Sequence, residues 1–209
     1  RDTHLSIERK ISLNPILNSF QAVVNKYNIE KDLIDSFLSS MEMDLNKKEH
    51  TEESYKKYIL GSAEAVGLMC LRVFTENNNG LYNELKPFAM SLGSVFQKIN
   101  FLRDLNADYI GMGRIYFPNI NIEELNQETK LDIENDIELD FEEGLIGIRK
   151  LPKKSRFGVY VAYIYYRSLF NKIKKLQPQS ILEERIRIPN AQKMVLFAGS
   201  YLRNSLNLL

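Results

Sequence analysis

The chain has 209 residues, of which 44% are hydrophobic and 26% charged, as in globular proteins with room for one sizeable core. The formal net charge is +1, so total charge gives no indication of nucleic-acid binding. One cysteine, Cys70, excludes an internal disulfide, and no run of about 18 apolar residues predicts a membrane-spanning helix. These features predict a cytoplasmic protein.

Glycine and proline are scarce, with ten and six residues, and apolar residues recur at spacings of three and four. This period predicts an all-α fold rather than a many-stranded sheet. The first two helices are expected at about 15–27 and 30–45, the second with Asp32 as a candidate cap. Thr51 begins a third, and 77–80 and 111–113 are predicted loops. The remaining ranges are about 51–75, 81–109, 134–150, 155–176 and 188–207.

Within the third predicted helix, small residues stand at 61, 62, 63, 65 and 67. They either let a neighbouring helix approach closely or leave room for a ligand, and the pattern alone favours close packing. One face of the same helix carries larger residues at three- and four-residue spacing: Tyr58, Ser62, Val66, Met69 and Val73.

The fourth predicted helix carries a polar stripe of Gln97, Asn100, Asp104 and Asp108. At about 1.5 Å per residue these side chains fall along one face over roughly 16 Å. Two carboxylates one turn apart repel each other, and a divalent cation would remove that repulsion. Mg²⁺ commonly takes one or two carboxylates together with water and substrate phosphate. The stripe therefore predicts a magnesium site.

A solvated helix face is the alternative interpretation of the two aspartates. The neighbouring apolar residues argue against it, because they predict a helix buried on most sides: Phe96, Ile99, Phe101, Leu102 and Leu105. A buried polar stripe requires partners. Arg103 and Arg114 are placed to grip phosphate oxygens, so a metal and a diphosphate are the expected partners.

The last predicted helix, about 188–207, is amphipathic, and its pattern favours a core helix with Tyr201 as a core tyrosine. Peripheral contact with a membrane is the alternative. The apolar side carries Ala191, Met194, Val195, Ala198, Tyr201, Leu202 and Ser205, with Lys193, Arg203 and Asn204 elsewhere.

Residues 97–108, followed by Gly113-Arg114-Ile115-Tyr116-Phe117-Pro118, resemble the second aspartate-rich motif of the phytoene/squalene synthase family. That motif runs Q-x-x-N-x-x-R-D-x-x-x-D and then G-R-x-Y-x-P. Residues 58–67 resemble the family's Y-x-x-x-x-A-G-x-V-G helix, in the same order and at the same separation. The resemblance is greatest to a bacterial phytoene synthase and weakest from about 120 to 185. It implies a single-domain, isoprenoid-synthase-type helical bundle around a central apolar cavity.

Family members join two isoprenyl diphosphates head to head with Mg²⁺, for which Mn²⁺ is an alternative, and the first step forms an allylic cation. Carried over, the resemblance implies Asn100, Asp104 and Asp108 as metal ligands, with both aspartates and Tyr58 catalytic. The implied substrate-binding residues are Gln97, Arg103, Arg114, Tyr201, Ser62 and Val66.

The chain departs from the family pattern at three points. Glu64 stands where the family has glycine, and the loop from Asp108 to Arg114 is one residue longer. The first aspartate-rich motif is not found, since Asp32-x-x-Asp35 has the wrong spacing. Residues 1–209 are therefore expected to form one helical domain without the N-terminal helices of a family member.

The expected activity is condensation of two geranylgeranyl diphosphates to phytoene, and the alternative is squalene or dehydrosqualene synthesis from farnesyl diphosphate. NADPH is expected only if squalene is the product. The competing class is a non-catalytic helical homologue that acts as a scaffold or assembly factor. An intact polar stripe argues against that class, because a scaffold needs no metal ligands. A monomer or homodimer that binds isoprenyl diphosphates and no nucleic acid is expected.

Overall fold

The computed structural model describes residues 1–209 apart from 47–48, 119, 121–124, 184, 207 and 209. Within this part of the chain there is no strand, only an isolated parallel bridge between Glu49 and Ile115. The all-α prediction is confirmed.

The chain runs through ten α-helices and one π-helical turn among the residues described. The first half comprises α1 (Asp2–Arg9), α2 (Pro15–Tyr27), α3 (Lys31–Asn46), α4 (Glu52–Ile59), the π turn η1 (Leu60–Glu64) and α5 (Ala65–Phe74). The second half comprises α6 (Asn79–Met112), α7 (Gln127–Lys150), α8 (Lys153–Lys174), α9 (Pro178–Ile181) and α10 (Asn190–Ser205).

Side-chain caps explain several of these boundaries. Asn14 accepts hydrogen bonds from the backbone of the first turn of α2, and Asn78 does the same for α6. The Thr51 and Ser54 side chains form a reciprocal capping box at the start of α4. At the other end of α6, Gly113 adopts the left-handed conformation, with φ of 62°, that commonly terminates helices.

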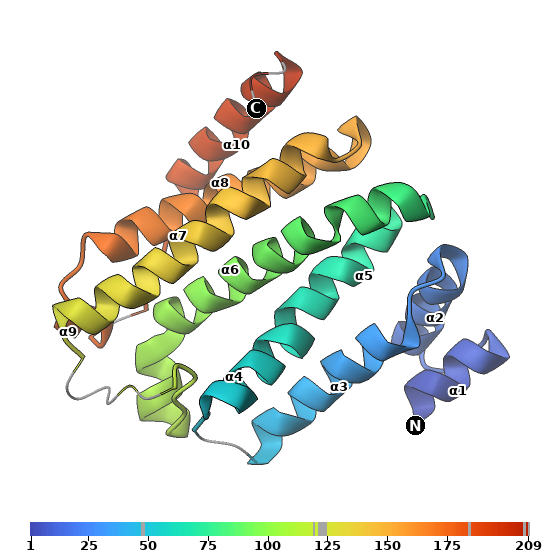
Figure 1. The fold of residues 1–209 in the computed structure, drawn as a ribbon, viewed down its shortest axis with the longest axis horizontal. Helices are drawn as coiled ribbons and strands as arrows, with labels where there is room; N and C mark the ends of the chain where they lie inside the picture. Colours follow the sequence, from blue (N-terminus) through green and yellow to red (C-terminus); the bar gives the residue numbers. More distant parts are fainter. Residues whose placement is uncertain (47–48, 119, 121–124, 184, 207, 209) are drawn as a thin grey trace.

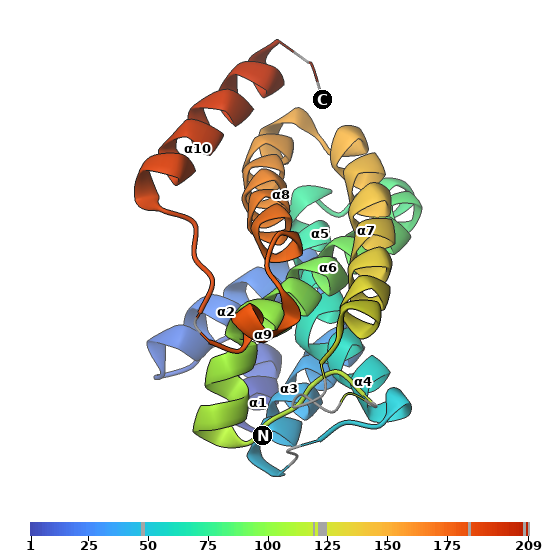
Figure 2. The same ribbon diagram turned by 90° about the vertical axis from the view of Figure 1, so that its left-hand side faces the viewer.

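Helix α6 is the centre of the molecule (Figure 1). It packs along α7 on one side and along η1 and α5 on the other, and it also contacts α8. Helix α3 covers η1 and α5 from outside, and the α1–α2 pair lies at the edge. Helix α10 packs mainly against α8 and stands away from the rest of the bundle (Figure 2).

The main hydrophobic core surrounds α6. Val95 and Ile99 of α6 are fully buried against Phe141 of α7 and Phe170 of α8. The prediction that the helix around the polar stripe is buried on most sides is therefore confirmed.

Several predicted boundaries were wrong. The single helix expected at 51–75 is interrupted by the π turn, and the loop expected at 111–113 is helical as far as Met112. The expected loop at 77–80 already contains the start of α6. The short helices α1 and α9, of eight and four residues, were not predicted, because so few residues give too little periodic signal.

The π turn lies where neighbouring backbones come unusually close. A Cβ atom on Gly93 of α6 would lie 2.5 Å from the carbonyl oxygen of Ala63, and one on Gly61 would lie 2.2 Å from that of Ser36. A side chain at either position would therefore push α6 or α3 away from the turn. Glu64, the residue that departs from the family pattern, is the last residue of this turn.

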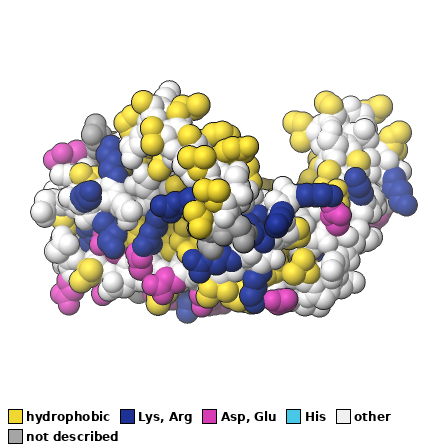
Figure 3. Space-filling view, turned by 90° about the horizontal axis from the view of Figure 1, so that it is seen from above, with side chains coloured by type: hydrophobic (Ala, Val, Ile, Leu, Met, Phe, Trp, Pro, Cys, Tyr) yellow, Lys and Arg dark blue, Asp and Glu magenta, His cyan; other side chains and the backbone are white. Residues whose placement is uncertain are grey.

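Charge is divided unevenly along the chain. Residues 149–209 contain 13 lysines and arginines and only two acidic residues, Glu183 and Glu184. Residues 1–148 contain 15 basic and 25 acidic residues. The acidic residues are concentrated in α7, while α8 and α10 carry none. Viewed from above, Lys and Arg side chains lie between two raised parts rich in hydrophobic side chains (Figure 3).

Candidate active site

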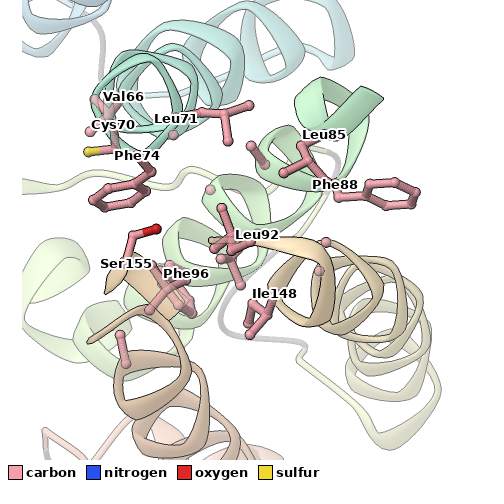
Figure 4. Close-up of a pocket in the computed structure, with 18 of the residues that line it drawn as sticks. Val66, Cys70, Leu71, Phe74, Leu85, Phe88, Leu92, Phe96, Ile148 and Ser155 are labelled. Carbon is pink, nitrogen blue, oxygen red and sulfur yellow. The ribbon is translucent and has the colours of Figure 1, made fainter. Parts of the chain in front are cut away.

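An apolar cavity of about 630 Å³ lies between α5, α6, α7 and α8 (Figure 4). Val66, Cys70 and Phe74, spaced four residues apart on α5, form one wall. Leu85, Phe88, Leu92 and Phe96 of α6 line it opposite, with Ile148 of α7 and Ser155 of α8 completing the circuit. Three predicted substrate-binding residues are among those that line the cavity: Ser62, Val66 and Gln97.

Some small residues at this cavity allow two helices to approach closely, and others leave open space. A Cβ atom on Gly67 would lie 2.6 Å from the carbonyl oxygen of Ala89, so this glycine lets α5 approach α6. Gly158 of α8 has no atom within 4 Å of the corresponding Cβ position, so it leaves open space beside the cavity.

Met69 and Val73 do not share the cavity-facing side of α5. Both pack instead against a separate cluster formed by Val24, Ile29 and Ile34 at the α2–α3 junction. The prediction of one continuous face from Tyr58 to Val73 was wrong in this part, because α3 covers the side of α5 that these two residues occupy.

Asp104 is held by two arginines. Arg103 forms an ion pair with one carboxylate oxygen and a hydrogen bond with the other at 3.0 Å, and Arg185 reaches Oδ1 at 2.6 Å. Burial acts to raise the pKa of Asp104, but the two guanidinium groups outweigh it and hold the pKa below its usual value. This carboxylate is therefore ionised and surrounded by positive charge.

Asp108 lies one turn further along α6 in a different electrostatic setting. Burial and, next, the charge of Asp104 raise its pKa, while Arg114 and Arg103 offset only part of the effect. The two carboxylates therefore repel each other, as their spacing predicted, and added positive charge would stabilise the pair.

Asn100 connects the carboxylates to the cavity. Its Nδ2 donates to Oε1 of Gln97 at 3.4 Å, and its Oδ1 accepts from the hydroxyl of Tyr166 at 3.1 Å. The Tyr166 ring stacks on Phe96 with 4.1 Å between ring centroids. The polar stripe thus continues directly into the cavity wall.

Tyr58 is buried in an aromatic cluster with Phe101 and Tyr116, outside the lining of the cavity. Its hydroxyl donates to Oδ2 of Asp44 at 3.0 Å, and Arg114 donates to the backbone oxygen of the same residue at 2.5 Å. Burial, together with Tyr116 and Asp44, raises the pKa of Tyr58, so this phenol is neutral. Asp44 therefore ties Tyr58 and Arg114 to α3.

Tyr201 does not line the cavity and is not a core tyrosine. Its side chain is 57% exposed and packs edge-on against Phe157 of α8, with 5.9 Å between ring centroids. The difference arises because α10 packs mainly against α8, which leaves most of its apolar residues uncovered.

Three residues at the site were not predicted: Asp44, Tyr166 and Arg185. Asp44 lies on α3, Tyr166 lies on α8 and Arg185 follows α9, so all three are far from residues 97–108 in the sequence. Nothing in the local spacing of these residues indicates that they meet the polar stripe.

The donor set fits Mg²⁺ bound together with substrate phosphate. Asp104, Asp108 and Asn100 offer hard oxygen donors on one face of α6, and Mg²⁺ commonly uses one or two carboxylates with water and phosphate. Among the residues that the structure describes, no group of three or more His, Cys, Asp or Glu side chains could enclose a metal. The Asp104, Asp108 and Asn100 side chains offer part of an oxygen ligand set, and water or phosphate would supply the other ligands of a bound Mg²⁺.

A second cavity of about 740 Å³ lies between α4, η1, α6 and α7. It is more polar, and Glu64 and Lys98 line it. Lys98 bridges Asp136 and Asp140 at 2.5 and 2.7 Å, so the buried positive charge is paired.

Comparison with known proteins gives a consistent result. The family model described as squalene/phytoene synthase matches residues 2–192. A 15-cis-phytoene synthase from Synechocystis is 27% identical over 190 residues, which cover 79% of this chain. The match spans 56% of the length of that relative.

Solved structures show the same fold. A dehydrosqualene synthase has a TM-score of 0.78 at 23% identity, covering 97% of this chain and 76% of its own. Squalene synthase HpnC from Alicyclobacillus acidocaldarius has a TM-score of 0.72 at 15% identity, covering 83% and 70%. The predicted isoprenoid-synthase-type bundle is confirmed. No helix in the described part of the chain is long and apolar enough to cross a bilayer.

Proposed function

We propose, because the chain belongs to the squalene/phytoene synthase family, that it acts in the head-to-head condensation of two isoprenyl diphosphates. The leading case is two geranylgeranyl diphosphates giving phytoene, two diphosphate ions and two protons. One observation supports this most directly: the apolar cavity adjoins, through Gln97 and Asn100, a polar stripe with two carboxylates and several arginines. A molecule with a long apolar chain and a diphosphate head matches both parts.

The polar end binds and orients the diphosphate in this proposal. Asn100, Asp104 and Asp108 would hold Mg²⁺, which supplies positive charge against the leaving diphosphate when bound. Arg103 and Arg114 contact phosphate oxygens, for which a guanidinium offers paired donors. Positive charge fixed at the leaving group favours breakage of the allylic carbon–oxygen bond.

The apolar part receives the prenyl chain and excludes water from the cation left behind. Phe96 and Tyr166 present stacked rings where Gln97 meets the cavity, and aromatic faces stabilise nearby positive charge. The double bond of the second isoprenyl diphosphate attacks this cation and forms a carbon–carbon bond between the two chains. The positive charge then lies on the second chain and is removed by loss of a proton. A cavity without water favours this bond over hydrolysis of the cation.

The substrate length and the product are the finer parts of the proposal. Squalene or dehydrosqualene synthesis from farnesyl diphosphate is the alternative, and NADPH enters only if squalene is formed. The other class is a non-catalytic homologue, which would retain the fold without binding Mg²⁺ or diphosphate. Ligand binding separates these classes before any product is measured.

Asp104→Asn is the test of the site. This change removes a charged ligand, and we expect Mg²⁺-dependent binding of a non-hydrolysable geranylgeranyl diphosphate analogue to weaken at least about tenfold. Turnover of geranylgeranyl diphosphate should fall further. Calorimetry measures binding, and circular dichroism checks that helix content is unchanged. Tight, Mg²⁺-dependent binding by a folded Asp104→Asn protein would contradict the assignment.

A further inference from the structure

The second cavity is distinct from the proposed active site. Among the residues that the structure describes, none lines both cavities. Its volume of about 740 Å³ is in the range of small-molecule sites. Apolar side chains from three parts of the chain contribute to its wall: Ile59 of α4, Ile133 of α7, and Phe117. The Tyr55 ring also lines it and lies 6.0 Å from that of Phe117, measured between ring centroids.

Glu64, the last residue of the π turn, places a carboxylate in this wall. It is half-buried, and no described residue forms a hydrogen bond or an ion pair with it. Burial and, next, the charge of Asp140 raise its pKa, and Lys98 offsets only part of this rise. Lys98 is already paired, because its ammonium group bridges Asp136 and Asp140. Glu64 is therefore a carboxylate without a counter-charge of its own.

An unpaired, half-buried carboxylate costs stability. The pKa of Glu64 is higher in the folded chain than in the unfolded chain, so the folded state favours the protonated form and loses stability as pH rises above about 4.3. The fold does not require the charge, since the family pattern that residues 58–67 resemble has glycine at this position. A group that costs stability and has no structural partner is a candidate for ligand binding.

The other charged side chains at the cavity are exposed or paired. Glu52, Lys56 and Asp132 are exposed, while Asp136 forms its ion pair with Lys98. Charges in contact with solvent attract a ligand weakly, because water and salt screen them. The half-buried carboxylate of Glu64 is screened less, so it determines the sign of charge that a ligand needs at this wall.

We propose that the second cavity binds an organic cation, a primary ammonium group on an apolar body, through the carboxylate of Glu64. An ammonium group supplies the positive charge and the hydrogen-bond donors that this carboxylate lacks. The apolar body packs against Ile59 and Ile133, and the rings of Tyr55 and Phe117 attract positive charge. The inference goes beyond the proposed function and does not depend on it, because neither the first cavity nor the polar stripe takes part.

Benzylamine, which is an ammonium ion at neutral pH, tests this site, with benzyl alcohol as the uncharged ligand of the same shape. Titrations followed by NMR give the two dissociation constants for the full chain. At neutral pH benzylamine should bind at least about tenfold more tightly, because only the ammonium group forms a charge-assisted hydrogen bond. Its affinity should fall with decreasing pH, with a midpoint above about 4.3, since protonated Glu64 no longer attracts a cation.

Glu64→Gln removes the charge, and Asp132→Asn is its matched control. Glu64→Gln should weaken benzylamine binding at least about tenfold and change benzyl alcohol binding by less than about twofold. Asp132→Asn removes the same charge from an exposed position of the same cavity, so it should change both constants by less than about twofold. Thermal unfolding checks the fold, and Glu64→Gln should have a higher Tm than the wild type at neutral pH, because an unpaired carboxylate is gone.

Equal affinities of the wild-type chain for benzylamine and benzyl alcohol would overturn the inference, since the ammonium group would then contribute nothing. Equal losses of benzylamine affinity in Glu64→Gln and Asp132→Asn would also overturn it, because overall charge and not the cavity would then attract the ligand. A folded Glu64→Gln protein that binds benzylamine as tightly as the wild type would exclude Glu64 as the partner.

Discussion

Val66 stands in the cavity wall while Met69, one turn later on α5, faces the α2–α3 cluster. Val66→Phe adds volume inside the cavity, and we expect it to shift the preference from geranylgeranyl towards farnesyl diphosphate, because less room remains for the longer chain. A shift of about tenfold in relative kcat/KM corresponds to loss of one or two buried methylene groups, at about 0.8 kcal/mol or more for each. Competition between the two diphosphates measures it.

Met69→Phe is the matched control for this prediction. It adds bulk to the same helix on the side away from the cavity, so chain-length preference should not change although stability falls. Equal shifts in the two variants would show that bulk acts through the helix and not through the cavity.

At the level of single residues, the sequence predicted what local spacing encodes. Gln97, Asn100, Asp104 and Asp108 lie on one face because three- and four-residue steps fix that geometry. Tyr201 could not be placed the same way, since amphipathic spacing shows that a helix has an apolar side but not which neighbour covers it. Asp44 and Arg185 required the tertiary fold.

At the level of the helices, one close approach is at Gly93, where α6 crosses the π turn. Gly93→Ala would place a methyl group 2.5 Å from a backbone oxygen, which cannot move without its helix. We expect a loss of about 2 kcal/mol in the free energy of unfolding, measured by urea denaturation.

Gly199→Ala in α10 should increase the stability of the protein, in contrast to Gly93→Ala. No atom lies within 4 Å of the Cβ position, so the substitution should stabilise the protein by about 0.5 kcal/mol through helix propensity. A Gly93→Ala protein as stable as Gly199→Ala would contradict the close crossing.

Arg72 of α5 ties three elements together through Glu30, Asn79 and the ring of Tyr82. Burial acts to raise the pKa of Glu30, but hydrogen bonds from Arg72 outweigh it and lower the pKa. A lowered pKa in the folded state means that the ion pair stabilises the fold above the unfolded pKa of about 4.3 and that this contribution is lost as pH falls through the folded value.

Glu30→Gln should therefore destabilise the protein near pH 7 and have no effect well below pH 4. Because Glu30 is 38% exposed, we expect only about 1 kcal/mol, or about 2–4 °C in Tm. Glu84→Gln, which removes a more exposed pair with Lys150, should leave Tm nearly unchanged at both pH values. A Tm difference for Glu30→Gln that persisted in acid would point to lost packing instead.

The predicted helices were confirmed where they are long, because many periods reinforce one another. The predicted helix boundaries were wrong at the π turn and around residue 111, where contacts with residues distant in the sequence determine the backbone conformation. The π turn lies where α3 approaches Gly61 and where Gly93 of α6 approaches Ala63, and glycine content alone does not specify those approaches.

For the molecule as a whole, α10 exposes apolar side chains within the basic part of the chain, residues 149–209. Met194, Val195, Tyr201 and Leu202 are each more than half exposed on this helix. Basic, partly apolar helices bind anionic bilayers, so we propose peripheral membrane contact here. The chain should float with liposomes rich in anionic lipid at low salt and be released by about 0.5 M salt.

Val195→Ser combined with Leu202→Ser is the matched variant for flotation, since both side chains are exposed and their loss should leave the fold intact. It should bind these liposomes more weakly at the same salt concentration. Absence of the wild-type chain from the lipid fraction at low salt would remove the proposal.

The uneven division of charge also gives the molecule an acidic helix, α7, and two helices without acidic residues, α8 and α10. A net charge of +1 suggests weak retention on ion-exchange resins near neutral pH. However, a resin binds the protein through the charges on the face that contacts it, so the net charge does not decide retention. Anion exchangers should retain the chain by the acidic surface of α7, and cation exchangers by α8 and α10. At low ionic strength, oppositely charged helices of neighbouring molecules should attract each other, and added salt should increase solubility.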